Sequence, residues 1–138
     1  MVDRTLNILL VEDDQVDVMN VERAFEKSHI LNPLHLAGNG EEALEMLRGG
    51  DVPLSPLLVL LDLNMPKMNG IEFLREVRSD EELRRLPVVV LTTSDDERDR
   101  IEAYDLNVAG YILKPVTFRS FVDAMGTLNK YWTLVEMP

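Results

Sequence analysis

The chain has 138 residues, of which 46% are hydrophobic, so it has the size of one ordinary domain and can bury a single core. It contains no cysteine, which excludes disulfides and thiolate metal sites. Its 25 acidic residues exceed its 14 basic residues and give a net charge of -11, which argues against a nucleic-acid-binding domain because such domains normally carry a basic patch for phosphates.

Strand patterns and helical patterns alternate along the chain. Apolar runs predict strands over residues 6–11, 34–37, 57–61, 87–91 and 111–113. Apolar residues at helical spacing predict helices that end near 27, run from 40 to 49, run from 71 to 78, end near 106, and begin near 117. We expect Ser94 or Asp95 to cap the fourth helix, with Ile101 and Tyr104 as its apolar contacts.

These elements form five units, each a strand followed by a helix. Strands that are apolar on both faces belong in a parallel sheet that is covered by helices on each side. The sequence shows no repeat, low-complexity segment or linker. We therefore predict a single doubly wound α/β domain over residues 1–138.

The longest apolar run, residues 57–61, is far shorter than the ~20 residues that a membrane helix needs. The N-terminal region also lacks an apolar stretch of the length typical of a signal peptide. We therefore expect a cytoplasmic protein that does not insert into membranes.

Polar side chains follow four of the five predicted strands. They are Glu12, Asp13 and Asp14 after the first strand, Asp62 after the third, Thr92, Thr93 and Ser94 at the fourth, and Lys114 after the fifth. Individually, the acids and hydroxyls could cap helices or turns, and the lysine could simply be exposed. In a parallel sheet, however, all of these groups gather beyond the same edge, where such folds bind ligands.

This combination of groups suits phosphoryl chemistry. Two or three carboxylates close together repel one another and need a cation, and Mg²⁺ takes oxygen ligands, to which the main-chain carbonyl of Asn64 could add. The Asp62 carboxylate can then act as a nucleophile and form an acyl phosphate. Lys114 would supply a positive charge and Thr92 a hydroxyl donor to the phosphoryl oxygens.

The segments ILLVEDD, LLDLNMPKMNG, PVVVLTTS and GYILKP stand in an order that resembles the receiver domains of bacterial two-component response regulators. The resemblance implies a flavodoxin-like (βα)5 fold with strand order 2-1-3-4-5. It also implies that Asp62 is the phosphoacceptor, that Thr92 and Lys114 assist it, and that Tyr111 is an aromatic switch. The implied Mg²⁺ ligands are Glu12, Asp13, Asp62 and the main-chain carbonyl of Asn64, with Asp13 bound directly and Glu12 through water. Glu12 stands where the family more commonly has Asp. A receiver catalyses only its own phosphorylation and dephosphorylation, so we do not expect an enzyme.

A finer resemblance is to the small stand-alone regulators of phytochrome-type histidine kinases. It lies in the segments LLDLNMP, VVVLTTSDD and GGDVPLSP and in the C-terminal NKYWTLVEMP. The resemblance implies a sensor histidine kinase, of the phytochrome type, as the partner.

The last helix and the tail, about residues 117–138, carry more apolar side chains than one core contact requires. Exposed apolar patches often mark an interface. We therefore expect a homodimer formed by this segment. The residues expected at the dimer interface are Phe118, Tyr131, Trp132, Leu134 and Val135.

Two alternatives differ in chemistry. A haloacid-dehalogenase-type phosphatase also uses an Asp nucleophile, but it places a second Asp two residues further on, where this chain has Asn64. A flavodoxin-like binding module without phosphorylation would place a Gly-rich phosphate loop after the first strand. Here Glu12, Asp13 and Asp14 occupy that place and would repel a nucleotide phosphate.

Overall fold

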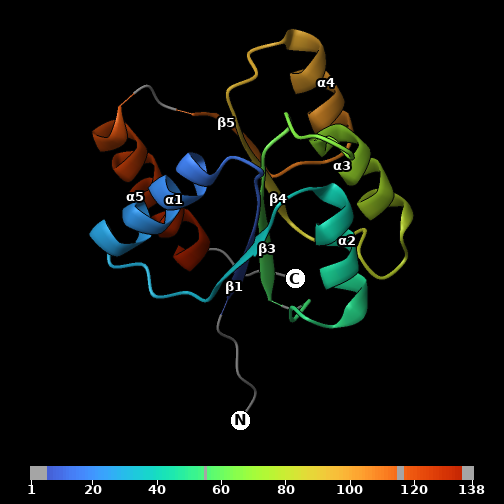
Figure 1. Ribbon diagram of the computed structural model, residues 1–138, viewed down its shortest axis with the longest axis horizontal. Coiled ribbons are helices and arrows are strands. Elements are labelled where there is room, and N and C mark those ends of the chain that lie inside the picture. Colours follow the sequence, from blue (N-terminus) through green and yellow to red (C-terminus); the bar gives the residue numbers. More distant parts are fainter. Residues whose placement is uncertain (1–5, 55, 115–116, 135–138) are drawn as a thin grey trace.

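The computed structural model describes residues 6–54, 56–114 and 117–134 (Figure 1). The strands are β1 (Asn7–Val11), β2 (Leu34–Ala37), β3 (Leu57–Leu61), β4 (Val88–Thr92) and β5 (Gly110–Leu113). The helices are α1 (Gln15–Lys27), α2 (Gly40–Gly49), α3 (Gly70–Ser79), α4 (Glu97–Asp105) and α5 (Phe118–Leu134). The predicted alternation of strands and helices is confirmed, with ends that differ by a residue or two.

The five strands form one parallel sheet in the order β2-β1-β3-β4-β5. This confirms the flavodoxin-like fold and the strand order that the family resemblance implied. The strand order reverses at β1, which pairs with β2 on one side and with β3 on the other. The carboxyl ends of β1 and β3 therefore lie side by side, at the place where doubly wound sheets bind their ligands.

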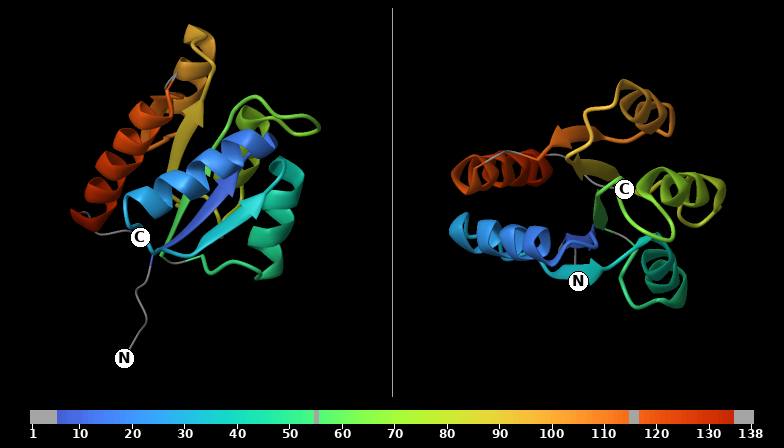
Figure 2. Two further views of the ribbon diagram at one scale, coloured as in Figure 1. Left: turned by 60° about the vertical axis from the view of Figure 1, so that its left-hand side comes forward. Right: turned by 45° about the horizontal axis from the view of Figure 1, so that its top comes forward.

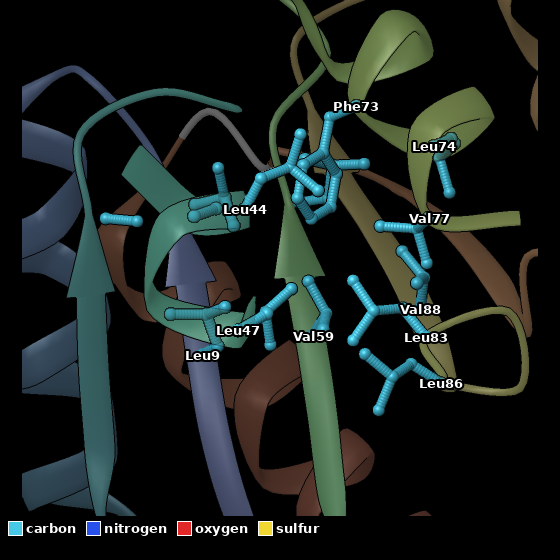
Figure 3. Packing of buried hydrophobic residues seen from close by; sticks show 14 of the residues in the cluster. Leu9, Leu44, Leu47, Val59, Phe73, Leu74, Val77, Leu83, Leu86 and Val88 are labelled. Atoms are coloured by element: carbon cyan, nitrogen blue, oxygen red, sulfur yellow. The ribbon is translucent and has the colours of Figure 1, made fainter. Parts of the chain in front are cut away.

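Helices cover both faces of the sheet. Figure 2 shows α1 and α5 on one face and α2, α3 and α4 on the other. The three central strands are buried on both faces, which explains their near-continuous apolar sequences. On the α2–α3 face, side chains such as Leu44, Phe73 and Val77 pack onto Leu9 and Val59 (Figure 3). In the segments that the structure describes, no helix combines the length and apolar character needed to cross a membrane.

Short polar side chains begin four of the helices. Asp14 caps α1, Asn39 caps α2, Asn69 caps α3 and Asp96 caps α4, each accepting a backbone N–H of the first turn. The expectation that Ser94 or Asp95 caps the fourth helix is therefore wrong.

The fourth helix also faces differently from the prediction. Ile101 is 54% exposed and Tyr104 is 50% exposed, whereas Ala103 is fully buried against the sheet. The expectation is wrong for Ile101, whereas Tyr104 does make an apolar contact, with the ring of Tyr111.

The structure of the C-terminal helix contradicts part of the expected dimer interface. Trp132 is only 4% exposed, and its ring lies 6.2 Å from that of Phe25 on α1. Its place on an exposed interface is therefore wrong, because one chain already buries it. Tyr131 is 48% exposed and stays a candidate. The side chains of Phe118 and Leu134, and the whole of Val135, lie outside what the structure describes.

Candidate phosphoryl-transfer site

The ends of β1 and β3 bring Glu12 and Asp62 together. The backbone N–H of Asp62 donates to the carbonyl of Val11 at 3.0 Å, and that of Glu12 donates to the carbonyl of Ala37 at 2.9 Å. Each acid thus directly follows a buried strand and is held by the sheet's own hydrogen bonds. Two buried strands therefore end in carboxylates that lie next to each other.

Three carboxylates meet at this point. The carboxylates belong to Glu12, Asp13 and Asp62. One oxygen from each of them lies within 4.8 Å of the other two. Glu12 and Asp62 are buried, and Asp13 is exposed on the solvent side. Within the described part of the chain, the buried Asp62 Oδ1 has no hydrogen-bond partner. A buried, unpaired carboxylate oxygen is costly.

The electrostatics of the cluster favour a cation. Burial raises the pKa of Glu12 from 4.5 to about 8, and the nearby charge of Asp62 adds to this effect, while hydrogen bonding to Lys114 opposes it. A bound divalent ion would reverse this tendency, because it stabilises the ionised carboxylates around it. Mg²⁺ prefers oxygen ligands and binds through one or two carboxylates together with waters and phosphate oxygens, so the donors present here fit it.

Lys114 lies against the same cluster. Its backbone N–H donates to the carbonyl of Thr92 at 2.8 Å, which places it beside the end of β4. The ammonium donates hydrogen bonds to Glu12 Oε1 and, at 2.7 Å, to Asp17 Oδ2, and Nζ is 3.8 Å from Asp62 Oδ1. Burial alone would lower the pKa of Lys114, but the hydrogen bonds from Nζ to Asp17 and Glu12 outweigh burial and raise it. Lys114 is therefore a fixed positive charge in this structure.

Thr92 and Tyr111 are linked through Ser94. Thr92 is fully buried, and its Oγ1 accepts the backbone N–H of Ser94 at 3.2 Å. The Tyr111 hydroxyl donates to the carbonyl of Ser94 at 2.9 Å. The ring of Tyr111 lies beneath the guanidinium of Arg100 and 6.5 Å from the ring of Tyr104. Tyr111 is thus held by one hydrogen bond to the loop before α4 and by two contacts of its ring with α4.

The structure brings most of the candidate residues to one edge of the sheet. Glu12, Asp13, Asp62 and Lys114 meet directly. Thr92 stands at the end of the neighbouring strand β4, and the Asn64 side chain is exposed in the loop after β3. The role of the Asn64 carbonyl as a metal ligand stays a prediction.

Sequence reasoning missed Asp17. It lies in the first turn of α1, three residues after the cap, and its partner Lys114 is far away along the chain. The available signal was that the first helix begins at the same edge of the sheet as the acidic cluster, so an acid in its first turn can reach that cluster.

Comparison with known proteins supports the same assignment. Residues 8–126 match the family model described as response regulator receiver domain. The probable methanogenesis regulatory protein FilR2 of Methanothrix harundinacea (strain 6Ac) is 40% identical over 128 residues, which are 91% of this chain and 82% of the relative. Response regulator Rcp1 of a Synechocystis species is 38% identical over 128 residues, which are 91% of this chain and 87% of Rcp1.

Solved structures of response regulators superpose closely. The Mn(2+)-bound form of Rcp1 has a TM-score of 0.86 at 35% identity, covering 97% of this chain and 99% of that one. The phosphorylated cyanobacterial phytochrome response regulator RcpA has a TM-score of 0.88 at 34% identity, covering 99% of both chains. The family match spans most of the chain. This chain belongs to the response regulator receiver domain family and is related to phytochrome response regulators.

Proposed function

We propose that Asp62 accepts a phosphoryl group from a phosphohistidine of a sensor histidine kinase, in a Mg²⁺-dependent reaction, and that this switches the protein's interaction surface. The observation that carries the proposal is the convergence of Glu12, Asp13 and Asp62 beside Lys114, with Asp62 Oδ1 buried and unpaired within the described residues. Such an oxygen is a carboxylate nucleophile without a competing hydrogen bond.

In the proposed transfer, Asp62 Oδ1 attacks phosphorus. An O–P bond forms, the N–P bond to the kinase imidazole breaks, and its electron pair returns to the imidazole nitrogen. Lys114 supplies positive charge beside Asp62, and the Thr92 hydroxyl donates a hydrogen bond to a phosphoryl oxygen. The expected metal ligands are Glu12, Asp13, Asp62 and the carbonyl of Asn64. When bound, Mg²⁺ neutralises charge on the transferring group.

The proposed output runs through Thr92 and Tyr111. If the Thr92 hydroxyl turns to the phosphoryl group, Ser94 loses the acceptor of its backbone N–H. The carbonyl of the same Ser94 accepts a hydrogen bond from the Tyr111 hydroxyl, so the position of the Tyr111 ring is coupled to that of Thr92. When Tyr111 moves, the surface formed by α4, β5 and α5 would change as well. This surface would then have two conformations, and the phosphoryl group would shift the balance between them.

The proposed partner is a phytochrome-type kinase. It is supported by the resemblance to Rcp1 and to RcpA, a phytochrome response regulator by its description. We place the reaction in the cytoplasm and propose that the chain forms a homodimer through α5. The chain would catalyse only its own phosphorylation and dephosphorylation.

Intact-mass measurement tests the phosphorylation directly. Incubation with Mg²⁺ and acetyl phosphate should add one phosphoryl group to the wild-type chain, and chelation of the metal should prevent it. Asp62→Asn should give no adduct, because an amide oxygen is a poor nucleophile. Asp123→Asn, which changes an exposed acid on α5 in the same way, should leave the adduct unchanged. A wild-type chain that stays unmodified, or an adduct that persists in Asp62→Asn, would overturn the proposal.

A further inference from the structure

Asp17 is a fourth carboxylate at the site, and it stands apart from the three that cluster. Its Oδ2 accepts a hydrogen bond from Lys114 Nζ at 2.7 Å, a length typical of strong charge-assisted bonds. The Asp17 side chain is 31% exposed and the Lys114 side chain 9% exposed. Asp17 belongs to α1, whereas Glu12 and Asp62 follow strands β1 and β3. The contact therefore ties the lysine to a helix rather than to the acidic cluster.

The backbone fixes the place of Asp17. Its own N–H donates to the side chain of the cap, Asp14, at 3.3 Å, and the cap also accepts the N–H of Val16 at 2.8 Å. A capped first turn holds its residues in place. Asp17 is thus a rigid anchor for the long, flexible lysine side chain.

Among the described residues, the hydrogen bonds of Lys114 leave one of its N–H donors free. An ammonium has three N–H donors, and two of them are directed at Glu12 Oε1 and Asp17 Oδ2. Asp62 Oδ1 lies 3.8 Å from Nζ, which is beyond hydrogen-bonding distance. The lysine is held near the acceptor oxygen without bonding to it, and this is why Asp62 Oδ1 remains unpaired among the described residues.

We propose that Asp17 is a positioning residue that holds Lys114 back from the free Asp62 carboxylate and keeps its third N–H available for a phosphoryl oxygen. This inference rests on the proposed function of Asp62. A phosphoryl group on Oδ1 carries its oxygens outward into the gap between Oδ1 and Nζ. The lysine then bonds the phosphoryl oxygens, which are present in the transition state and in the product, but not the free acceptor. An interaction that is made in the transition state and not in the ground state accelerates the transfer.

Asp17 is needed for this because Glu12 has two roles. Glu12 is one of the three clustered carboxylates as well as a partner of Lys114. Asp17 is outside the cluster, so its hold on Lys114 does not depend on what the cluster binds. Without Asp17, Lys114 is free to move closer to Asp62 and to donate a hydrogen bond to Oδ1, which stabilises the unphosphorylated state and blocks the acceptor oxygen.

A crystal structure of metal-free Asp17→Ala gives the first test, independent of any phosphorylation. Nζ of Lys114 should lie within hydrogen-bonding distance of Asp62 Oδ1 in the variant, instead of the 3.8 Å found here. Asp17→Asn keeps an acceptor oxygen and should keep the longer distance. A distance that is unchanged in Asp17→Ala would overturn the proposal.

Beryllofluoride, a non-covalent mimic of the phosphoryl group, gives the second test. With Mg²⁺ present, fluorine NMR should show binding on the order of tenfold weaker in Asp17→Ala, the loss expected for one displaced charge-assisted contact. Asp17→Asn should recover most of the affinity. Glu22→Ala, which removes an exposed acid from the same helix, should bind like the wild type.

The outcomes separate the two proposals. Equal or tighter beryllofluoride binding in Asp17→Ala overturns the role of Asp17 while leaving that of Asp62 intact. Failure of the wild type to bind beryllofluoride, or to be modified on Asp62, overturns the proposed function. In that case, the distance from Lys114 Nζ to Asp62 Oδ1 in crystals of Asp17→Ala still reports whether Asp17 holds the lysine away. The test of Asp17 therefore does not depend on the test of phosphorylation.

Discussion

Gly70, the first residue of α3, lets the loop after β3 pass close to the start of that helix. A Cβ at this position would lie 2.6 Å from the carbonyl oxygen of Asp62 and 2.7 Å from the Cα of Leu63, both of them backbone atoms. Backbone cannot yield as the end of a flexible side chain does. The glycine is therefore tied to the placement of Asp62 itself.

Replacing this glycine should disturb both stability and the site. Gly70→Ala should lower the free energy of unfolding by about 1–3 kcal/mol, the usual cost of overpacking. It should also weaken Mg²⁺ binding, because the backbone that carries Asp62 must shift. Urea denaturation and calorimetric Mg²⁺ titration measure the two effects.

Gly49→Ala is the matched control for this substitution. A Cβ at Gly49 meets only a carboxylate oxygen of Asp51, at 3.6 Å, and alanine favours a helix over glycine. We expect unchanged Mg²⁺ binding and equal or slightly greater stability in this variant. If Gly70→Ala behaved like Gly49→Ala, the close approach would have no bearing on Asp62.

At the scale of elements, the sequence predicted the buried strands and the residues that follow their carboxyl ends. Strands β1, β3 and β4 are buried on both faces, so their apolar runs could be recognised without knowledge of their neighbours. Parallel strands end at one edge, so the residues that follow them could be placed together. The strand order itself came from the family resemblance, because apolar runs do not say which strands pair.

The surroundings of the site could not be read in the same way. Asp17 pairs with a lysine 97 residues away, and nothing local to α1 marks that contact. Ile101 and Tyr104 have helical spacing, yet α4 buries only Ala103, since packing distance rather than periodicity decides which side chains fit. Trp132 stands near the end of the chain, but a long α5 carries it back along α1. These outcomes depend on tertiary packing.

The junction of α4 and β5 yields a prediction about Tyr111. Burial raises the pKa of the Tyr111 phenol above its ordinary value of about 10, and the charge of Asp99 adds to this, while the hydrogen bond to Ser94 opposes it. Carbon NMR of the labelled ring should therefore show the phenol losing its proton above that value. Tyr111→Phe should remove the signal and identify it.

The same resonance reports whether the ring moves. With Mg²⁺ and beryllofluoride bound, a Tyr111 that leaves its contacts with Ser94 and Arg100 should change both its chemical shift and its pKa. Tyr131, an exposed tyrosine on α5, serves as the comparison within the same spectrum. A Tyr111 signal that is identical in the free and bound protein would reject the coupling between Asp62 and this surface.

At the scale of the whole molecule, α1 and α5 form one face of the domain, and Trp132 belongs to the core beneath it. Its ring packs against Phe25, and it is the chain's only tryptophan. Trp132→Phe should therefore lower the free energy of unfolding, because it leaves a cavity between the helices. It should not change the number of chains in the assembly, since the side chain is not available to a partner.

Tyr131, the exposed neighbour of Trp132, allows dimerisation to be tested without disturbing the core. If α5 forms the proposed homodimer, Tyr131→Asp should shift the mass measured by light scattering at micromolar concentration toward that of one chain, since a charge at an apolar contact is costly to bury. Tyr104→Asp places the same charge on a similarly exposed tyrosine of α4 and should leave the mass unchanged. A wild-type chain that stays monomeric at this concentration, with and without beryllofluoride, would exclude the dimer, and the exposed face of α5 would then need no partner copy to explain it.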